Sequence, residues 1–408
     1  MRKVIVTMMF ILFVLIVKTF GQQDDKLLDV KFSGYVHWMA AYDSRQIVAV
    51  REGHFFLYPK NIQKDAYGRD INATANLNMA AIQSRAGIKV TGPSFLNAKT
   101  SAFLEAEFMG NSDADVNGLR IRHAYLTMAW DKFEITAGQT WNLLFNPEVA
   151  PQSTGSNGGS PFLAFARNPQ LKFGYNTAGF KFSAALLSER DYTSAGPNGN
   201  SSEYLRNAVL PIIQTSLSYK CEFLLAGAAA EVKQIKPAIK TSKNYFTDEK
   251  VNSFAISGYS KFIINKFSST FFAIYGGNLT DFTMIGGYAV KSVDTLSMIK
   301  KYIPLKTFAC YADFSYGKEI EFGLFAGYTK NLGAGEDIKN EIYARGQDIK
   351  DVFRFAPRVQ FSQGKIKSTL ELEMTFADYG NNNSKGEVID THQVKNVRIM
   401  TSLYYYFN

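Results

Sequence analysis

The chain has 408 residues and a formal net charge of +9. Its 33 Phe and 22 Tyr, against 3 Trp and 11 Pro, are typical of a strand-rich protein. Lys and Arg are spread thinly without a basic run, which argues against a nucleic-acid partner. The two cysteines, Cys221 and Cys310, are too few for a disulfide scaffold, and we expect both to be free.

The first residues have the pattern of a secretory signal peptide. A basic start at 1–3 precedes an unbroken apolar run at 4–17 and a polar exit at 18–23. The run is short for a bilayer span, so a cleaved signal peptide over 1–21 is favoured over a membrane anchor. The mature part, 22–408, is then a single domain. Without Arg2, Lys3 and Lys18 its formal charge is 9 − 3 = +6.

Segments of about ten residues with alternating apolar and polar positions follow. In 365–377, for example, Leu370 and Leu372 share one face while Glu371 and Glu373 share the other. The same alternation runs through 80–91, 102–108, 353–362 and 396–407. Neither a helical apolar period nor a long apolar segment is found after the signal. This pattern predicts an all-β fold, a transmembrane antiparallel β-barrel.

Short and long connections alternate along the chain, as expected for long extracellular loops and short periplasmic turns. Seven turns are predicted at 92–94, 130–132, 176–179, 219–222, 265–266, 316–318 and 363–365. Eight loops are predicted near 44–68, 111–118, 142–167, 189–206, 236–250, 278–304, 331–350 and 380–391. Seven turns and eight loops join 16 strands. A count of 18 is the alternative, because 285–290 could form a strand pair of its own.

The last segment, 401–408, reads TSLYYYFN. An aromatic terminal strand of this type is what outer-membrane barrels present to their assembly machinery. A soluble β-sandwich would also alternate, but it would not need such an end. The sequence therefore predicts a protein of the outer membrane of a diderm, Gram-negative-type bacterium, in contact with lipid and with the barrel assembly machinery.

Sixteen strands enclose an aqueous channel, so the face opposite the lipid carries the function. On that face the alternation places basic and acidic side chains: Arg85, Lys89, Arg354, Arg358, Arg398, Glu105, Glu107, Glu371 and Glu373. On closure the strands of Arg85, Arg354, Arg358 and Arg398 should meet on one stretch of wall. Such a basic stripe favours anions. The alternative is a set of solvated salt bridges on a wet wall.

The third loop, 142–167, is the most apolar of the eight. Leu, Phe and Pro flank a Ser- and Gly-rich centre, and so much apolar surface is unfavourable in water. We expect this loop to fold into the barrel and narrow it. The alternatives are packing on a neighbouring subunit or a short outer helix.

Three stretches carry a resemblance to a known family: LRIRHAY (119–125), GQTW (138–141) and RNPQLKFGY (167–175). Together they resemble the DcaP-like family of trimeric outer-membrane porins, which take up small anionic organic molecules such as dicarboxylates. The resemblance implies a homotrimer and adds Arg122 and Arg167 to the constriction. Alternation leaves the placement of Arg122 open, because Arg120 and Arg122 share a face with Leu126 and Met128.

The function favoured by the sequence is an outer-membrane diffusion porin for small hydrophilic solutes, with a preference for anions of the carboxylate type. The alternatives are a barrel-embedded enzyme and a structural or adhesive barrel without a conducting pore. None of the four histidines, His37, His54, His123 and His392, lies in a nucleophile motif or at metal-ligand spacing. No enzyme activity, cofactor or metal is therefore expected.

Overall fold

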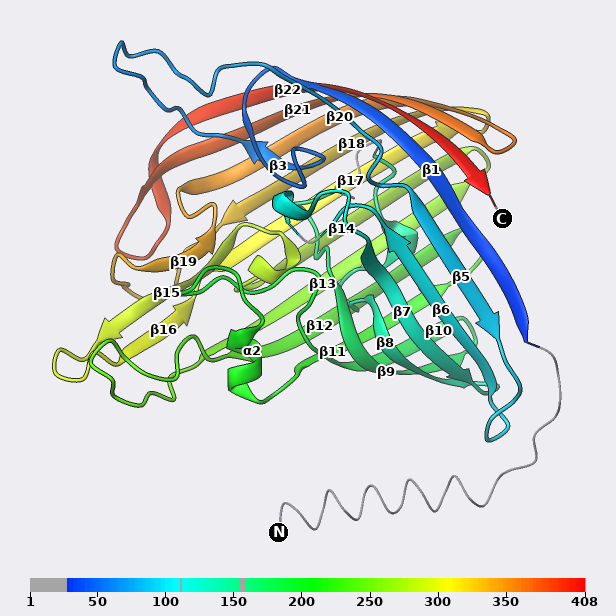
Figure 1. Cartoon of the computed structure of the whole chain (residues 1–408), viewed down its shortest axis with the longest axis horizontal. Helices are drawn as coiled ribbons and strands as arrows, with labels where there is room; N and C mark the ends of the chain where they lie inside the picture. The colour runs from blue at the N-terminus through cyan, green and yellow to red at the C-terminus, as the bar shows by residue number, and fades with distance from the viewer. Residues whose placement is uncertain (1–27, 111, 154–158, 408) are drawn as a thin grey trace, which may run out of the picture.

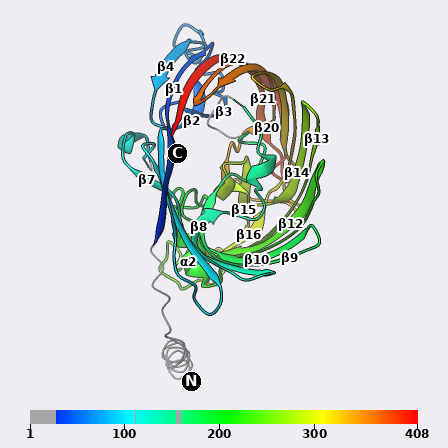
Figure 2. The same cartoon turned by 90° about the vertical axis from the view of Figure 1, so that its right-hand side faces the viewer.

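Backbone polar groups in a bilayer must find partners within the protein, and the strands of this chain do so by closing on themselves. The computed structural model describes residues 28–110, 112–153 and 159–407. The signal peptide expected over 1–21 lies outside the described residues. Figure 1 shows the strands side by side as a tilted sheet, and Figure 2, turned by 90°, shows them as a ring.

The ring is a single antiparallel sheet. Its strands are β1 (Asp29–Asp43), β4 (Asn76–Ala80), β5 (Arg85–Thr91), β6 (Lys99–Glu107), β7 (Arg120–Ala129), β8 (Phe133–Trp141), β9 (Arg167–Thr177), β10 (Phe180–Leu187), β11 (Ile212–Lys220), β12 (Leu224–Ile235), β13 (Val251–Ile264), β14 (Phe267–Gly277), β17 (Lys306–Gly317), β18 (Ile320–Asn331), β20 (Ile349–Gln363), β21 (Ile366–Asn382) and β22 (Val388–Phe407). Of these 17, β4 and β5 both pair with β1 and are two halves of one wall strand, so 17 − 1 = 16. The predicted 16-stranded barrel is confirmed.

The break between β4 and β5 corrects one detail of the expected alternation. Strict alternation through 80–91 places Ile82 on the same lipid-facing side as Ile88, but Ile82 is buried. The Ser84 hydroxyl accepts a hydrogen bond from the backbone N–H of His37 at 3.0 Å, so a side chain takes the place of a ladder partner here. The local strand geometry is lost over 81–84, and with it the period of two.

The two ends of the barrel meet at β1 and β22. Their register runs from Gly34 opposite Phe407 to Asp43 opposite Arg398. Arg398 donates two hydrogen bonds to the Asp43 carboxylate, both at 2.8 Å. The aromatic end of the chain, as far as Phe407, is therefore built into the wall as its closing strand.

The two faces of the wall differ sharply. On β21, Leu370 is 51% exposed on the outer face, whereas Glu371 and Glu373 on the inner face are at most 1% exposed. Exposed Leu, Ile, Phe and Tyr side chains cover the outside of most strands. A closed barrel with an apolar exterior is a transmembrane protein of the outer membrane, as predicted. In the described ranges, no helix has the length and apolarity to cross a bilayer.

Connections alternate in length around the barrel, and the seven predicted turns fall at short connections between wall strands. Within the sixth long loop, 286–290 of the predicted 285–290 segment do form strand structure, but not in the wall. β15 (Gly286–Val293) pairs with β16 (Lys300–Pro304) and β19 (Ile342–Arg345) in a separate three-stranded sheet. Because β14 pairs directly with β17, the 18-stranded alternative is excluded. The longer connections also hold α2 (Glu203–Ala208) and three short 3-10 turns, η1 (Asp113–Asp115), η2 (Pro147–Val149) and η3 (Thr280–Phe282).

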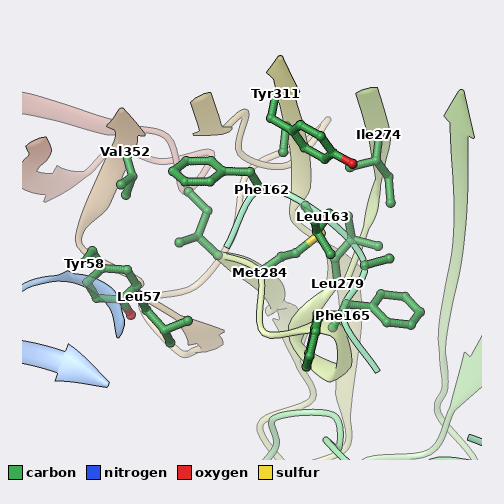
Figure 3. Packing of buried hydrophobic residues seen from close by; sticks show 14 of the residues in the cluster. Leu57, Tyr58, Phe162, Leu163, Phe165, Ile274, Leu279, Met284, Tyr311 and Val352 are labelled. Atoms are coloured by element: carbon green, nitrogen blue, oxygen red, sulfur yellow. The ribbon is translucent and has the colours of Figure 1, made fainter. Parts of the chain in front are cut away.

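The described residues of loop three, 142–153 and 159–166, fold into the barrel. Phe162 and Leu163 are fully buried against inner-wall residues such as Tyr311 and Ile274, as Figure 3 shows. Gly327 on the inner face of β18 leaves the space, because a Cβ there would lie 2.6 Å from the Phe162 ring. Burial of each such side chain stabilises the folded protein by about 1.5–3 kcal/mol. The prediction of an inward loop is confirmed.

The first loop also enters the barrel, and the alternation pattern in the sequence does not predict this. Its hairpin, formed by β2 (Ile47–Val50) and β3 (Phe55–Pro59), carries Leu57 and Tyr58 into the same apolar cluster as loop three. Figure 3 shows both of these side chains facing the cluster. The barrel interior thus holds an apolar core between two inserted loops and the wall.

Candidate pore-lining site

A β-bulge sets the direction of the arginines on β7. Pairing between β6 and β7 shifts by one residue, from Glu105 opposite His123 to Ala106 opposite Ile121. The extra residue turns Arg120 and Arg122 to the inner face, while Leu126 beyond the bulge stays on the outer face. This resolves the ambiguity that simple alternation left at this strand.

The arginines of β5 and β7 meet the carboxylates of β6. Glu107 is fully buried and accepts from Arg122 Nη1 at 2.8 Å and Arg85 Nε at 3.2 Å. It also accepts from Arg120. Glu105 accepts from Arg122 Nε at 2.7 Å. Four of the predicted pore-lining residues are therefore joined in one ion-pair network.

Asp191, in the connection after β10, extends this network. Arg167 donates to its carboxylate from Nε at 2.9 Å and from Nη2 at 2.7 Å, and Arg120 donates from Nη1 at 3.2 Å. Burial alone would raise the pKa of Asp191, but the guanidinium groups of Arg167 and Arg120 lower it below its usual range. Asp191 thus stays ionised and holds its loop against the wall.

Arg354 and Arg398 hold the inserted loops. Arg354 donates to the carbonyl of Ser160 at 3.0 Å and to that of Leu57 at 2.8 Å. Both guanidinium groups contact the Phe56 ring, and each Cζ lies 4.7 Å from the ring centroid. Such cation–π contacts are worth about 1–2 kcal/mol when desolvated. Loops one and three are thereby fastened to the wall by two arginines.

Arg358 on β20 forms an ion pair with a carboxylate of the wall, Asp313 on β17. It donates to both carboxylate oxygens of Asp313, at 2.8 and 2.9 Å. Gly323, directly opposite on β18, makes room, because a Cβ there would lie 2.4 Å from the guanidinium. This bidentate pair is buried in the wall of the barrel.

The expected basic stripe therefore needs correction. Arg85, Arg354, Arg358 and Arg398 do lie on neighbouring strands, since β20, β21, β22, β1 and β5 follow one another around the barrel. Three of them are at most 5% exposed, and each is engaged with carboxylates or backbone carbonyls. The sequence shows which face a residue is on, but not that loops and carboxylates cover it.

Several inner-face lysines lie outside these networks, among them Lys89, Lys172 and Lys367. Lys89 is four residues from Arg85 on β5, Lys367 is four residues from Glu371 on β21, and Lys172 stands opposite the buried Thr136. Within the described ranges, none of the three has a carboxylate oxygen within 4.0 Å. Lys172 was missed in the sequence, although it alternates with the outward Leu171 and Phe173.

Comparison with known proteins rests on structure, because no family model and no curated protein sequence match the chain. The outer membrane channel DcaP of Acinetobacter baumannii superposes with a TM-score of 0.71, covering 95% of this chain and 99% of that one at 18% identity. The chain has the fold of a DcaP-like porin. The predicted resemblance is confirmed at the level of fold.

Two further solved structures superpose with lower TM-scores than this DcaP channel. The trimer form of OmpT, an outer membrane protein of Vibrio cholerae, gives a TM-score of 0.56 at 11% identity, covering 94% of this chain and 100% of that one. OmpF of Salmonella typhi, in complex with daunomycin, gives 0.54 at 10% identity, covering 93% and 97%. At such identities the likeness concerns the fold alone.

The described residues of this DcaP-like fold hold no group of three or more His, Cys, Asp or Glu side chains that could bind a metal ion. Cys221 and Cys310 are both free. His123 lies beside Trp141 and Thr140, with its Nδ1 3.2 Å from the Thr140 hydroxyl. It belongs to the packing around the arginine network.

Proposed function

We propose that the chain is an outer-membrane diffusion porin that passes small hydrophilic solutes and prefers anions, organic acids of the carboxylate type among them. A 16-stranded wall with a polar inner face supports the porin role. The anion preference rests on inner-face lysines without ion pairs, and Lys89, Lys172 and Lys367 are the three on which we base it. An ammonium group without a carboxylate partner attracts passing anions, whereas a paired arginine is largely neutralised.

A structural barrel without a conducting pore is the second candidate. The observation that favours it is the apolar core between the inserted loops, which fills part of the interior. The polar side chains of the inner wall on the periplasmic side of loop three, such as Lys181, Ser216 and Ser218, favour a water-filled path instead.

The anion preference can be tested by removing lysine charge from the wall. Changing Lys89 and Lys367 together to Gln should move the zero-current potential in a KCl gradient toward cation preference. The shift should shrink as salt rises, because exposed charges are screened over about 8 Å at physiological salt. Changing the exposed Arg190 to Gln is the control for a lost surface charge. A reversal potential equal to that of the unchanged protein at low salt would refute this source of selectivity.

Processing and assembly belong to the same proposal. We propose that residues 1–21 are removed on export and that the barrel forms a homotrimer, which the resemblance to DcaP-like porins supports. Purified protein whose first residue lies upstream of 22, or which runs as a monomer in unboiled gels, would contradict this.

A further inference from the structure

A cavity of about 580 Å³ lies beneath loop three, on the periplasmic side of the interior. Its wall is formed by β9, β10 and β11, and loop three forms its cover with Leu143, Phe145 and Pro147. The β9–β10 turn, 177–179, borders the cavity on the periplasmic side. It is separate from the arginine network of β5 to β7, since none of Arg85, Arg120 or Arg122 lines it.

Three neighbouring strands each bring one lysine into this cavity: Lys172, Lys181 and Lys220. Lys181 donates to Glu134 at 2.8 Å, and Lys220 is paired with Glu148. Three ammonium groups against two carboxylates leave a formal charge of 3 − 2 = +1. Because Lys172 has no carboxylate within 4.0 Å in the described residues, the surplus charge resides on its side chain.

Hydroxyl groups line the same cavity as Lys172, with Ser183 on the neighbouring strand β10 and Ser216 and Ser218 on β11. Ser183 stands directly opposite Ser216, and Ser218 opposite Lys181, so their side chains share the inner face with the lysines. A cavity that holds an ammonium group and several hydroxyl donors is suited to a compact oxyanion, because charge-assisted hydrogen bonds are the stronger ones. Trp141 at the end of β8, together with Leu143 and Phe145 of loop three, adds an apolar surface to the lining. Convergent polar groups within an apolar lining are typical of small-molecule sites.

We propose that this cavity is a binding subsite for small organic oxyanions. The oxyanion binds at Lys172 with the hydroxyls of Ser183 and Ser216, and the hydrocarbon body of the solute packs under loop three. The subsite deepens the porin proposal and rests on it, since it places recognition of the anion at lysines rather than at the buried arginines.

Trp141 lines the cavity and gives a direct readout. The other two Trp residues do not line it, since Trp38 is exposed on the outer wall and the Trp130 indole donates to the carbonyl of Leu96. Sodium succinate should change the Trp emission of the detergent-solubilised barrel saturably, at constant ionic strength set with NaCl. Changing Lys172 to Met should raise the apparent Kd for succinate at least about tenfold.

Changing Lys266 to Met is the charge-matched control, because this exposed lysine lies at the β13–β14 turn outside the cavity. Sodium phosphate, an oxyanion without a hydrocarbon body, tests the contribution of the apolar cover. If phosphate binds as tightly as succinate, the charge alone accounts for recognition. If phosphate binds more weakly, the apolar cover contributes to the affinity for succinate. Equal Kd values for K172M and K266M, with both variants showing the far-UV circular dichroism of the unchanged barrel, would overturn the subsite.

Failure of the subsite and failure of the porin proposal can be told apart. A barrel that conducts with anion preference but binds succinate independently of Lys172 refutes only the subsite. A barrel that does not conduct but binds succinate through Lys172 refutes the porin proposal and supports the subsite.

Discussion

Single arginines in this barrel fix the position of loops more than they attract solutes. Arg354 reaches two backbone carbonyls from different loops, those of Ser160 and Leu57, and also the Thr375 hydroxyl at 2.9 Å. A charge buried this deeply is stabilised by its own partners, and removing it leaves them unpaired. Arginine is suited to this role because its planar group offers several donors in fixed directions.

Changing Arg354 to Gln should therefore loosen both inserted loops without changing ion preference. The loss of three hydrogen bonds and of the contact with Phe56 should destabilise the barrel by about 3 kcal/mol. Single-channel recordings should show more open-channel noise, and the temperature of unfolding should fall. The exposed Arg190 changed to Gln is the control. A shift of the reversal potential toward cations in the Arg354 variant alone would show that this arginine selects ions after all.

At the scale of elements, the alternation of side chains predicts a strand well only where the strand is regular. β20, β21 and β22 follow the expected period of two, with Phe353 and Leu403 outside and Arg358 and Arg398 inside. The bulge on β7 and the break at 81–84 interrupt that period. Both irregularities depend on neighbouring strands, so no local pattern in the sequence could locate them.

The apolar side chains of loop three should hold it inside the barrel. Changing Phe162, Leu163 and Phe165 together to Ser removes the stabilisation that comes from their burial, about 1.5–3 kcal/mol for each side chain. The loop should then leave its position against Tyr311 and Ile274, and single-channel conductance should rise. Leu296, 81% exposed, changed to Ser is a control in another loop. A conductance equal to that of the Leu296 variant would mean that loop three does not limit the bore.

At the scale of the whole molecule, the sequence predicts the wall better than it predicts the interior. Strand number, turns and the closing strand follow from local signals, namely alternation and the turn residues between segments. The partners of the arginines do not: Asp191 and Asp313 are 24 and 45 residues away from Arg167 and Arg358, and Asp43 meets Arg398 only where the barrel closes. The insertion of the β2–β3 hairpin was missed for the same reason. Its contacts with β20 and β21 join residues that are 297 and 320 positions apart in the sequence.

The central claim is that this barrel conducts and prefers anions, and a planar bilayer tests it most directly. Purified protein added to one side should produce stepwise current increases in symmetric KCl. In a KCl gradient the zero-current potential should have the sign of Cl⁻ preference, and it should be larger at low salt than at high salt. An absence of current steps from folded, heat-modifiable protein would contradict the porin function, and a potential of the opposite sign would contradict the anion preference.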